Sequence, residues 1–471
     1  MIDTVKLKFI QKNIFAYLLA VFCALFIAIG MYSDYSSYLI FGSIIIVIYS
    51  LLLIRPVNFL FYLLLTSCIF TIPFLSEQNH NVGTMSIQSL RWIATFFISL
   101  GVLLGDQKTL LKIIKNNLWF FIFLFYGFSL FLFKGNFLSG IKGNFLSGIK
   151  VLVLFTNIML VAGLAYKYYD GSIKIITKLE KMVFLSALFV IVLEMSPILT
   201  WDSDVLLIGY SNVSTILVFP AIMALNEYIF TRNKNYFFIY LFMSAMTFLA
   251  MGRMGICSLL LCSFVGVFFQ YKSSKIKKVF MLFFVMFFLG LIGYLLFPQL
   301  QKRMYLSVDT TSKVDMDEIT RGSNIRFTGR LALWTLLLQE YSSSKLFGLG
   351  PSSSEYIGKE ISDQICDHPH SQYLLTIVDF GIVGCLLITQ WLFTLFKKML
   401  KCSKSSLIQC RYLSFLMFLL FIHLGIVSVG DTIVYYPTTI SVIFAVFLGI
   451  FLKQYDINLE MEKTSYKKDS M

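Results

Sequence analysis

The sequence predicts an all-α protein that crosses a membrane many times. Of its 471 residues, 58% are hydrophobic and only 14% are charged, and the mean hydropathy is +0.80. Soluble globular proteins hold about 25% charged residues. Apolar runs of about 20 residues recur along the chain, and this is the length that an α-helix needs to cross the hydrocarbon core of a bilayer. A polytopic membrane protein is therefore expected.

Fourteen runs qualify as predicted spans. They lie at about 13–31, 37–54, 57–75, 90–105, 118–133, 150–166, 183–200, 206–228, 236–251, 254–271, 279–297, 373–395, 411–428 and 434–452. The chain is thus expected to comprise transmembrane helices 1 to 11 at 1–297, a large external loop at 298–372, helices 12 to 14 at 373–452 and a cytoplasmic tail at 453–471.

Charge orients these predicted spans. Short loops rich in Lys and Arg stay on the cytoplasmic side, and an N-terminus inside the cell places most of the 39 basic residues in such loops. Both termini and the 397–411 loop are then cytoplasmic, while 298–372 is external. Much of the net charge of +14 is thus a topology signal, and the basic composition does not call for a nucleic acid as partner.

A tandem octapeptide is the main exception to the charge rule. Residues 134–141 read Lys-Gly-Asn-Phe-Leu-Ser-Gly-Ile and are repeated letter for letter at 142–149. Two short copies do not make a solenoid, which stacks several units of about 20 or more residues. We interpret the repeat as a duplicated external loop. It places Lys134, Lys142 and Lys150 on the outer side.

Two ionisable residues within or beside the spans stand out. Glu194 lies in the seventh predicted span, where a charge is costly and serves either function or helix packing. Arg253 lies in the turn Met251-Gly252-Arg253-Met254-Gly255 between two apolar runs, which holds it at the outer membrane surface. It is either an anchor at a helix end or a phosphate ligand, because the two glycines would let backbone or a phosphate approach closely.

The external segment ends in three features that suit chemistry. Arg330 heads an apolar helix predicted to reach Gln339 and to lie on or dip into the outer leaflet, with Trp334 suited to an interface. A glycine-rich turn follows at 348–350, and His370 stands just before the chain re-enters the membrane.

From about 247 to 384, the chain resembles the O-antigen ligase and polymerase family, bacterial polytopic glycosyltransferases of the Wzy-like and WaaL-like kinds. The resemblance consists of an arginine in a short outer turn, a second arginine before a tryptophan-bearing helix, a Gly-x-Gly turn, and a histidine that opens a His-x-x-Tyr-Leu and acid-x-Gly-x-x-Gly pattern. The matching positions are Arg253, Arg330, Trp334, Gly348, Gly350, His370, Tyr373, Leu374, Asp379, Gly381 and Gly384. Gly252 and Ser371 depart from the serine and asparagine that the family often has there.

The resemblance implies a glycosyltransferase in the bacterial cytoplasmic membrane that uses an undecaprenyl-diphosphate-linked oligosaccharide and needs neither metal nor cofactor. Arg253 and Arg330 would bind the diphosphate, because a guanidinium holds phosphate oxygens bidentately. A helix N-terminus near Gly350 would add backbone donors. His370 would take a proton from the acceptor hydroxyl. The supporting residues would be Trp334, Gly348, Gly350, Tyr373 and Asp379. Membrane lipid surrounds such a protein, and a chain-length regulator protein is a candidate partner.

Several alternatives stay open. Fourteen spans are more than is common among the ligases, which favours a polymerase over a ligase that transfers glycan to lipid A core. A flippase or other transporter would show internal repeats or polar residues scattered through its spans. His368 competes with His370 as the functional histidine, and the spacing to Tyr373 favours His370.

Overall fold

The computed structural model describes residues 56–65, 67, 87–134, 142–194, 210–250, 252–270, 330–361, 369–435 and 439–469. In these ranges the chain forms helices and turns, without a strand. In chain order the helices are α3 (Pro56–Leu65), α5 (Ile87–Leu104), α6 (Gln107–Asn116), α7 (Leu118–Lys134), α8 (Lys142–Tyr168), α9 (Ile173–Glu194), α10 (Tyr210–Thr231), α11 (Lys234–Leu249), α12 (Arg253–Gln270), α16 (Arg330–Tyr341), η2 (Ser342–Ser344), α17 (Ser353–Ile361), α18 (Gln372–Ser403), α19 (Ile408–Gly430), η3 (Ile433–Tyr435) and α20 (Ile440–Asp469).

The long helices support the predicted class of all-α membrane protein. Within the described residues, α8, α10, α18, α19 and α20 are long and apolar enough to cross a membrane, and α6 with α7 adds a sixth candidate if that pair, bent by 91°, is one span. Predicted spans at 90–105, 183–200, 236–251 and 254–271 overlap α5, α9, α11 and α12, which fall short of the same test of length and apolarity. The predicted spans at 13–31, 37–54 and 279–297 lie outside the described residues.

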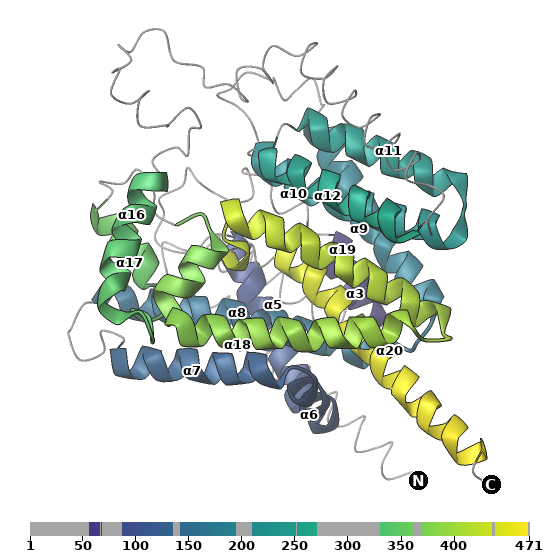
Figure 1. Ribbon diagram of the computed structural model, residues 1–471, viewed down its shortest axis with the longest axis horizontal. Coiled ribbons are helices and arrows are strands. Elements are labelled where there is room, and N and C mark those ends of the chain that lie inside the picture. The colour runs from purple at the N-terminus through teal and green to yellow at the C-terminus, as the bar shows by residue number, and fades with distance from the viewer. Residues whose placement is uncertain are drawn as a thin grey trace, which may run out of the picture.

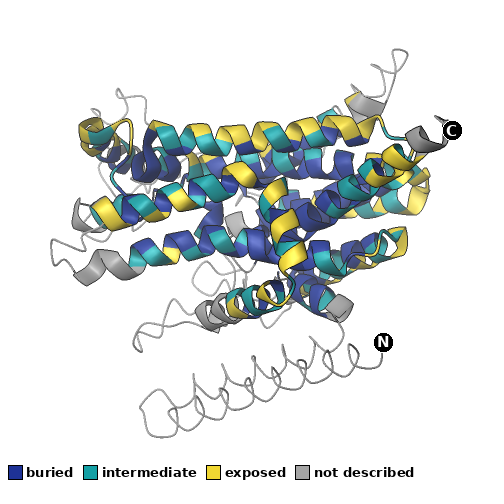
Figure 2. Ribbon diagram, turned by 90° about the horizontal axis from the view of Figure 1, so that it is seen from below, coloured by how far each residue is buried: buried dark blue, intermediate teal, exposed yellow. Residues whose placement is uncertain are grey.

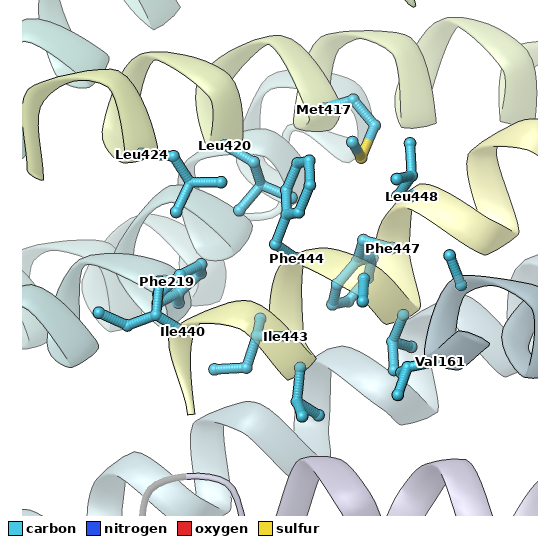
Figure 3. Close-up of a cluster of buried hydrophobic side chains, with 14 of the residues drawn as sticks. Val161, Phe219, Met417, Leu420, Leu424, Ile440, Ile443, Phe444, Phe447 and Leu448 are labelled. Atoms are coloured by element: carbon cyan, nitrogen blue, oxygen red, sulfur yellow. The ribbon is translucent and has the colours of Figure 1, made fainter. Parts of the chain in front are cut away.

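The bundle is packed around α20. Figure 3 shows Phe444, Phe447 and Leu448 of this helix beside Met417 and Leu420 of α19, and all five side chains are buried. On another side α20 lies so close to α8 that a Cβ atom at Gly449 would collide with the Ala162 backbone. Because lipid tails are as apolar as leucine, close van der Waals packing of this kind is what holds membrane helices together.

The outward faces of the helices carry exposed apolar side chains. Figure 2 shows buried positions lining the interior and exposed positions on the outside of the helices. Phe125 and Phe133 of α7 are 73% and 84% exposed, and Leu386 of α18 is 63% exposed. A soluble protein would not leave such side chains in water. These faces suit contact with lipid chains.

Two segments that were predicted to lie outside the spans are helical. The second octapeptide copy, 142–149, forms the first two turns of α8, so the prediction of a loop is wrong for this copy. Residues 135–141 lie outside the described residues, and the outer location of the repeat stays a prediction. At the other end of the chain, α20 continues through the predicted tail to Asp469. Lys401 of α18 forms a salt bridge of 2.8 Å with Glu462 on this extension.

The predicted external loop, 298–372, is described at 330–361 and 369–372. Helices α16 and α17 lie side by side at one end of the bundle, against α18 (Figure 1). Helix α16 confirms the helix predicted to begin at Arg330. Three parts of the chain meet at this end of the bundle. They are the α16–α17 pair, the start of α18 and the connection between α19 and α20.

Candidate functional site

Helix α18 is broken at Gly381, whose φ of 66° and ψ of −169° are not helical. The break frees backbone groups on both sides, and the 345–350 loop pairs with them. Leu349 N donates to Val378 O (2.8 Å) and Gly350 N to Asp379 O (2.9 Å), while Ile382 N donates to Lys345 O and Val383 N to Leu346 O (both 3.1 Å). The loop thus replaces the hydrogen bonds that the helix gives up, as buried backbone requires.

Two side-chain hydroxyls complete this pairing. Tyr126 Oη of α7 lies 2.9 Å from Phe347 O and 3.0 Å from Phe380 O. Tyr341 Oη donates to Lys345 O at 2.7 Å. Burial raises the pKa of the Tyr341 phenol, so this hydroxyl keeps its proton and remains a donor at neutral pH.

The Gly-x-Gly turn is explained by backbone contact. Gly348 and Gly350 have φ values of 76° and 110°, which favour glycine. A Cβ atom at Gly348 would lie 2.5 Å from Asp379 O, and one at Gly381 would collide with Gly348 N. These glycines therefore let the loop and the broken helix approach closely. Their role in the structure is packing.

Asp379 caps α17 from inside α18. Its side chain is fully buried, and its two carboxylate oxygens each accept a backbone hydrogen bond of 2.8 Å, Oδ2 from Ser352 N and Oδ1 from Ser354 N. A carboxylate at a helix N-terminus is stabilised by these donors and by the helix dipole. The backbone donors that we expected near Gly350 for a phosphate are therefore engaged by Asp379.

Trp334 holds the backbone that precedes His370. Its Nε1 donates to Pro369 O at 2.7 Å, across from α16 to the start of α18. His370 has a left-handed φ of 45°, a conformation that costs about 1–2 kcal/mol outside glycine. On the far side, Gln372 N donates to Asp431 O at 3.0 Å. Hydrogen bonds on both flanks thus fix a strained histidine.

His370 faces an acid that sequence analysis missed. Its Nδ1 lies 3.9 Å from Asp431 Oδ1, and the two side chains are 34% and 18% exposed. The distance is long for a hydrogen bond, so the two groups interact through charge only when the imidazole is protonated. Asp431 is the C-cap of α19. The only sequence signal for it is an acid directly after an apolar run.

Arg253 begins α12 at the same end of the bundle. Its side chain is exposed. Its neighbour Met254 packs on the end of α19, since a Cβ atom at Gly430 would lie 2.9 Å from Met254 Cγ. Gly430 directly precedes Asp431. The start of α12 therefore lies against the end of α19, where Asp431 is the C-cap.

Gly255, two residues after Arg253, serves helix packing. A Cβ atom at Gly255 would collide with Ser214 of α10, and Ser214 Oγ also donates to Gly252 O at 3.1 Å. We expected the two glycines to leave room for a phosphate. At Gly255, the backbone of α10 occupies this room.

The remaining predicted residues take different positions. Arg330 is the first residue of α16, one helical turn before Trp334, and its side chain is not described. Tyr373 is 55% exposed and donates to Gly425 O of α19 at 2.9 Å, a packing contact. His368 lies outside the described residues.

A second acid, Glu355 of α17, was also missed. It is 4% exposed, and its Oε2 accepts from Tyr435 Oη at 3.3 Å and from Ser352 Oγ at 3.4 Å. Lys150 of α8 lies 5.7 Å above the Tyr435 ring. Because Tyr435 follows Asp431 by four residues, one short connection touches both acids of this end. Within the described residues, no group of three or more His, Cys, Asp or Glu side chains could hold a metal ion.

These observations define a helical membrane protein with a histidine, an arginine and buried acids gathered at one end. Residues 238–389, about a third of the chain, match the family model described as O-Antigen ligase. The match spans Arg253, Arg330, the Gly-x-Gly turn, His370 and Asp379. The resemblance to the O-antigen ligase and polymerase family is confirmed for this region. No curated protein matches the chain.

We expect Asp379→Asn to loosen α17 without unfolding the bundle. The amide would present a donor to a backbone N–H, and hydrogen bonds to a charged group contribute about 1.5–3 kcal/mol. Hydrogen exchange should speed up for amides of residues 352–355. Asp170→Asn is the matched control, because Asp170 also accepts a backbone hydrogen bond, from Ser172 N at 2.8 Å. Asp170 is exposed, so water can take the place of the lost hydrogen bond and exchange should change little. Unchanged exchange in Asp379→Asn would contradict the capping role.

We expect Trp334→Phe to lower turnover roughly 2- to 10-fold at unchanged protein level. The phenyl ring keeps the apolar packing but removes one neutral hydrogen bond, which contributes about 0.5–1.5 kcal/mol. Trp119→Phe, at a half-exposed position on α7, is the control and should behave as wild type. Equal turnover in the two variants would show that the indole does not position His370.

Proposed function

We propose that the protein is an O-antigen or capsular polysaccharide polymerase. It would transfer a glycan from undecaprenyl diphosphate to a sugar hydroxyl of another lipid-linked repeat unit, on the outer side of the cytoplasmic membrane. The observation that carries this proposal is the placement of His370 against Asp431, in a chain whose 238–389 region matches the O-antigen ligase family.

The proposed reaction needs one base and a site for a diphosphate. The acceptor hydroxyl gives its proton to His370, and its oxygen forms a bond to the anomeric carbon of the donor glycan. The bond from that carbon to the diphosphate oxygen breaks, and undecaprenyl diphosphate leaves with the electron pair. Asp431 stabilises the imidazolium that forms, and this stabilisation is greatest in the transition state.

Arginine suits the leaving group. The diphosphate gains negative charge as the bond breaks, and a guanidinium can hold two of its oxygens while remaining protonated at any working pH. Arg253 is exposed at the start of α12. Arg330 is proposed as the second ligand, from the first turn of α16. This chemistry uses positioning and charge and requires no bound cofactor.

A ligase is the second candidate, because the matched family is itself described as O-Antigen ligase. The two enzymes would share the donor and the base and would differ in the acceptor, another repeat unit or lipid A core. We favour the polymerase because the sequence predicts fourteen spans. In this proposal both termini are cytoplasmic, and the undecaprenyl-linked oligosaccharide, membrane lipid and a chain-length regulator protein are the partners.

Purified protein given lipid-linked repeat units alone distinguishes these functions. A polymerase should produce a ladder of longer glycans, which gel electrophoresis resolves. A product that forms only when lipid A core is added would identify a ligase. If neither mixture gives product while the protein moves the lipid-linked unit across vesicles, the glycosyltransferase proposal is wrong.

We expect His370→Ala to lower turnover by about 10²- to 10⁴-fold, the contribution typical of a positioned acid or base. Its amount in the membrane should stay near the wild-type level, because the imidazole is partly exposed and is not part of the buried core. His368→Ala, the neighbouring control, should retain most activity. The reverse result would transfer the role to His368, and a parallel loss of protein would indicate a structural histidine.

A further inference from the structure

Helix α6 turns away from the direction of the membrane spans, because it meets α7 at an angle of 91°. Helix α7 has no charged residue before Lys134, and it lies alongside α18 (Figure 1), a helix long and apolar enough to cross a membrane. A helix at a right angle to such a span runs roughly parallel to the membrane surface. Lys398, near the C-terminal end of α18, contacts Asn116 of α6. Helix α6 is thus at the end of the bundle opposite His370.

Polar contacts from α18 hold α6 in this direction. Lys398 Nζ donates to Asn116 O and to Asn116 Oδ1, at 2.7 and 2.8 Å, so an ammonium group satisfies a carbonyl at the C-terminus of α6. At the bend itself, the buried Asn117 accepts a hydrogen bond of 3.0 Å from Trp391 Nε1 of α18 and donates through Nδ2 to Ile113 O at 3.1 Å. These contacts fix the right angle between α6 and α7.

One face of α6 combines positive charge with exposed apolar surface. Its three lysines, Lys108, Lys112 and Lys115, recur at a spacing of three or four residues and are exposed, so they lie on one face. Leu111, three residues after Lys108 and four before Lys115, is 64% exposed on the same face, whereas Ile113 is buried. Helices that lie in a membrane interface have this composition, with apolar side chains among the acyl chains and lysines reaching the headgroups.

Nearby acids leave this charge largely uncompensated. Asp106 caps the N-terminus of α6 through Thr109 N at 3.2 Å, and its carboxylate forms a salt bridge of 3.2 Å with Lys167 of α8. Glu460 of α20 lies 3.8 Å from Lys112, and the two side chains are 71% and 51% exposed. An ion pair this exposed contributes little. The lysine face of α6 therefore remains positive.

We propose that α6 binds anionic phospholipids, with Lys108, Lys112 and Lys115 against the headgroup phosphates and Leu111 among the first segments of the acyl chains. Membrane lipid is the occupant because α6 is held parallel to the bilayer surface beside a span, at the depth where headgroups lie. Each lysine near an anionic lipid surface strengthens binding by about fivefold. The site takes no part in glycosyl transfer and does not depend on the proposed reaction.

Thermal unfolding of the purified full-length protein in detergent tests this surface without reference to activity. The protein is titrated with phosphatidylglycerol and, separately, with phosphatidylcholine, which carries no net charge. We expect phosphatidylglycerol to raise the Tm by about 2 °C or more above the phosphatidylcholine reference. The rise should shrink in about 1 M NaCl, because salt at that concentration screens charges beyond about 3 Å.

Variants of α6 identify the lysines as the ligands. The triple variant Lys108→Gln/Lys112→Gln/Lys115→Gln should lose the rise, and the corresponding triple arginine variant should keep it, because the charges remain. The matched control removes three exposed lysines of similar spacing from the first turns of α9, Lys174→Gln/Lys178→Gln/Lys181→Gln. This control should respond as the wild type does. If the triple glutamine variant of α6 does not fold, Lys108→Gln/Lys115→Gln takes its place.

Three results would overturn the proposal. Phosphatidylglycerol that raises the wild-type Tm no more than phosphatidylcholine does would show that α6 binds no anionic lipid. Equal responses of the α6 and α9 variants would show that the protein responds to net charge rather than through α6. An equal rise with inorganic phosphate alone would identify a site for the free ion instead of a lipid surface.

Discussion

The backbone pairing between the 345–350 loop and the broken helix α18 is the constraint on which the rest of the site depends. A helix that stops hydrogen-bonding at Gly381 inside a membrane must find other partners, because lipid offers none. The loop supplies them only at close range, so Gly348 and Gly381 are in backbone contact. That contact fixes α16 and α17, the two helices on either side of the loop, against α18. The Asp379 cap then orients α17, and Trp334 of α16 reaches the residue before His370.

This arrangement of α16, α17 and α18 explains the strained backbone at His370. A left-handed histidine is retained only where its surroundings determine it strongly. Here the α16–α17 unit holds one flank through Pro369, and the connection after α19 holds the other through Gln372. Two parts of the structure that are far apart in sequence therefore set the direction of one imidazole. Its position near Asp431 follows from the fold as a whole rather than from a local motif.

Sequence patterns predicted the parts of the site that local chemistry determines. The turn at Arg253, the helix that begins at Arg330 and the histidine before α18 were all visible from charge, apolar runs and the family resemblance. The break in α18 was not visible in the sequence, because Gly381 lies in an apolar run and its contact, Gly348, is far upstream. Asp431 and Glu355 were missed for a similar reason. Each reads as an ordinary charge near a helix end, and its burial depends on tertiary packing.

The residues that surround His370 come from outside the family match as well as from within it. The family match stops at residue 389, yet Asp431 faces the histidine from beyond it, and Tyr435 reaches Glu355 from the same connection. In the structure the matched region is therefore completed by the α19–α20 connection. Helices α19 and α20 pack against each other through the buried core (Figure 3). The packing of that core thus determines how firmly Asp431 is held beside His370.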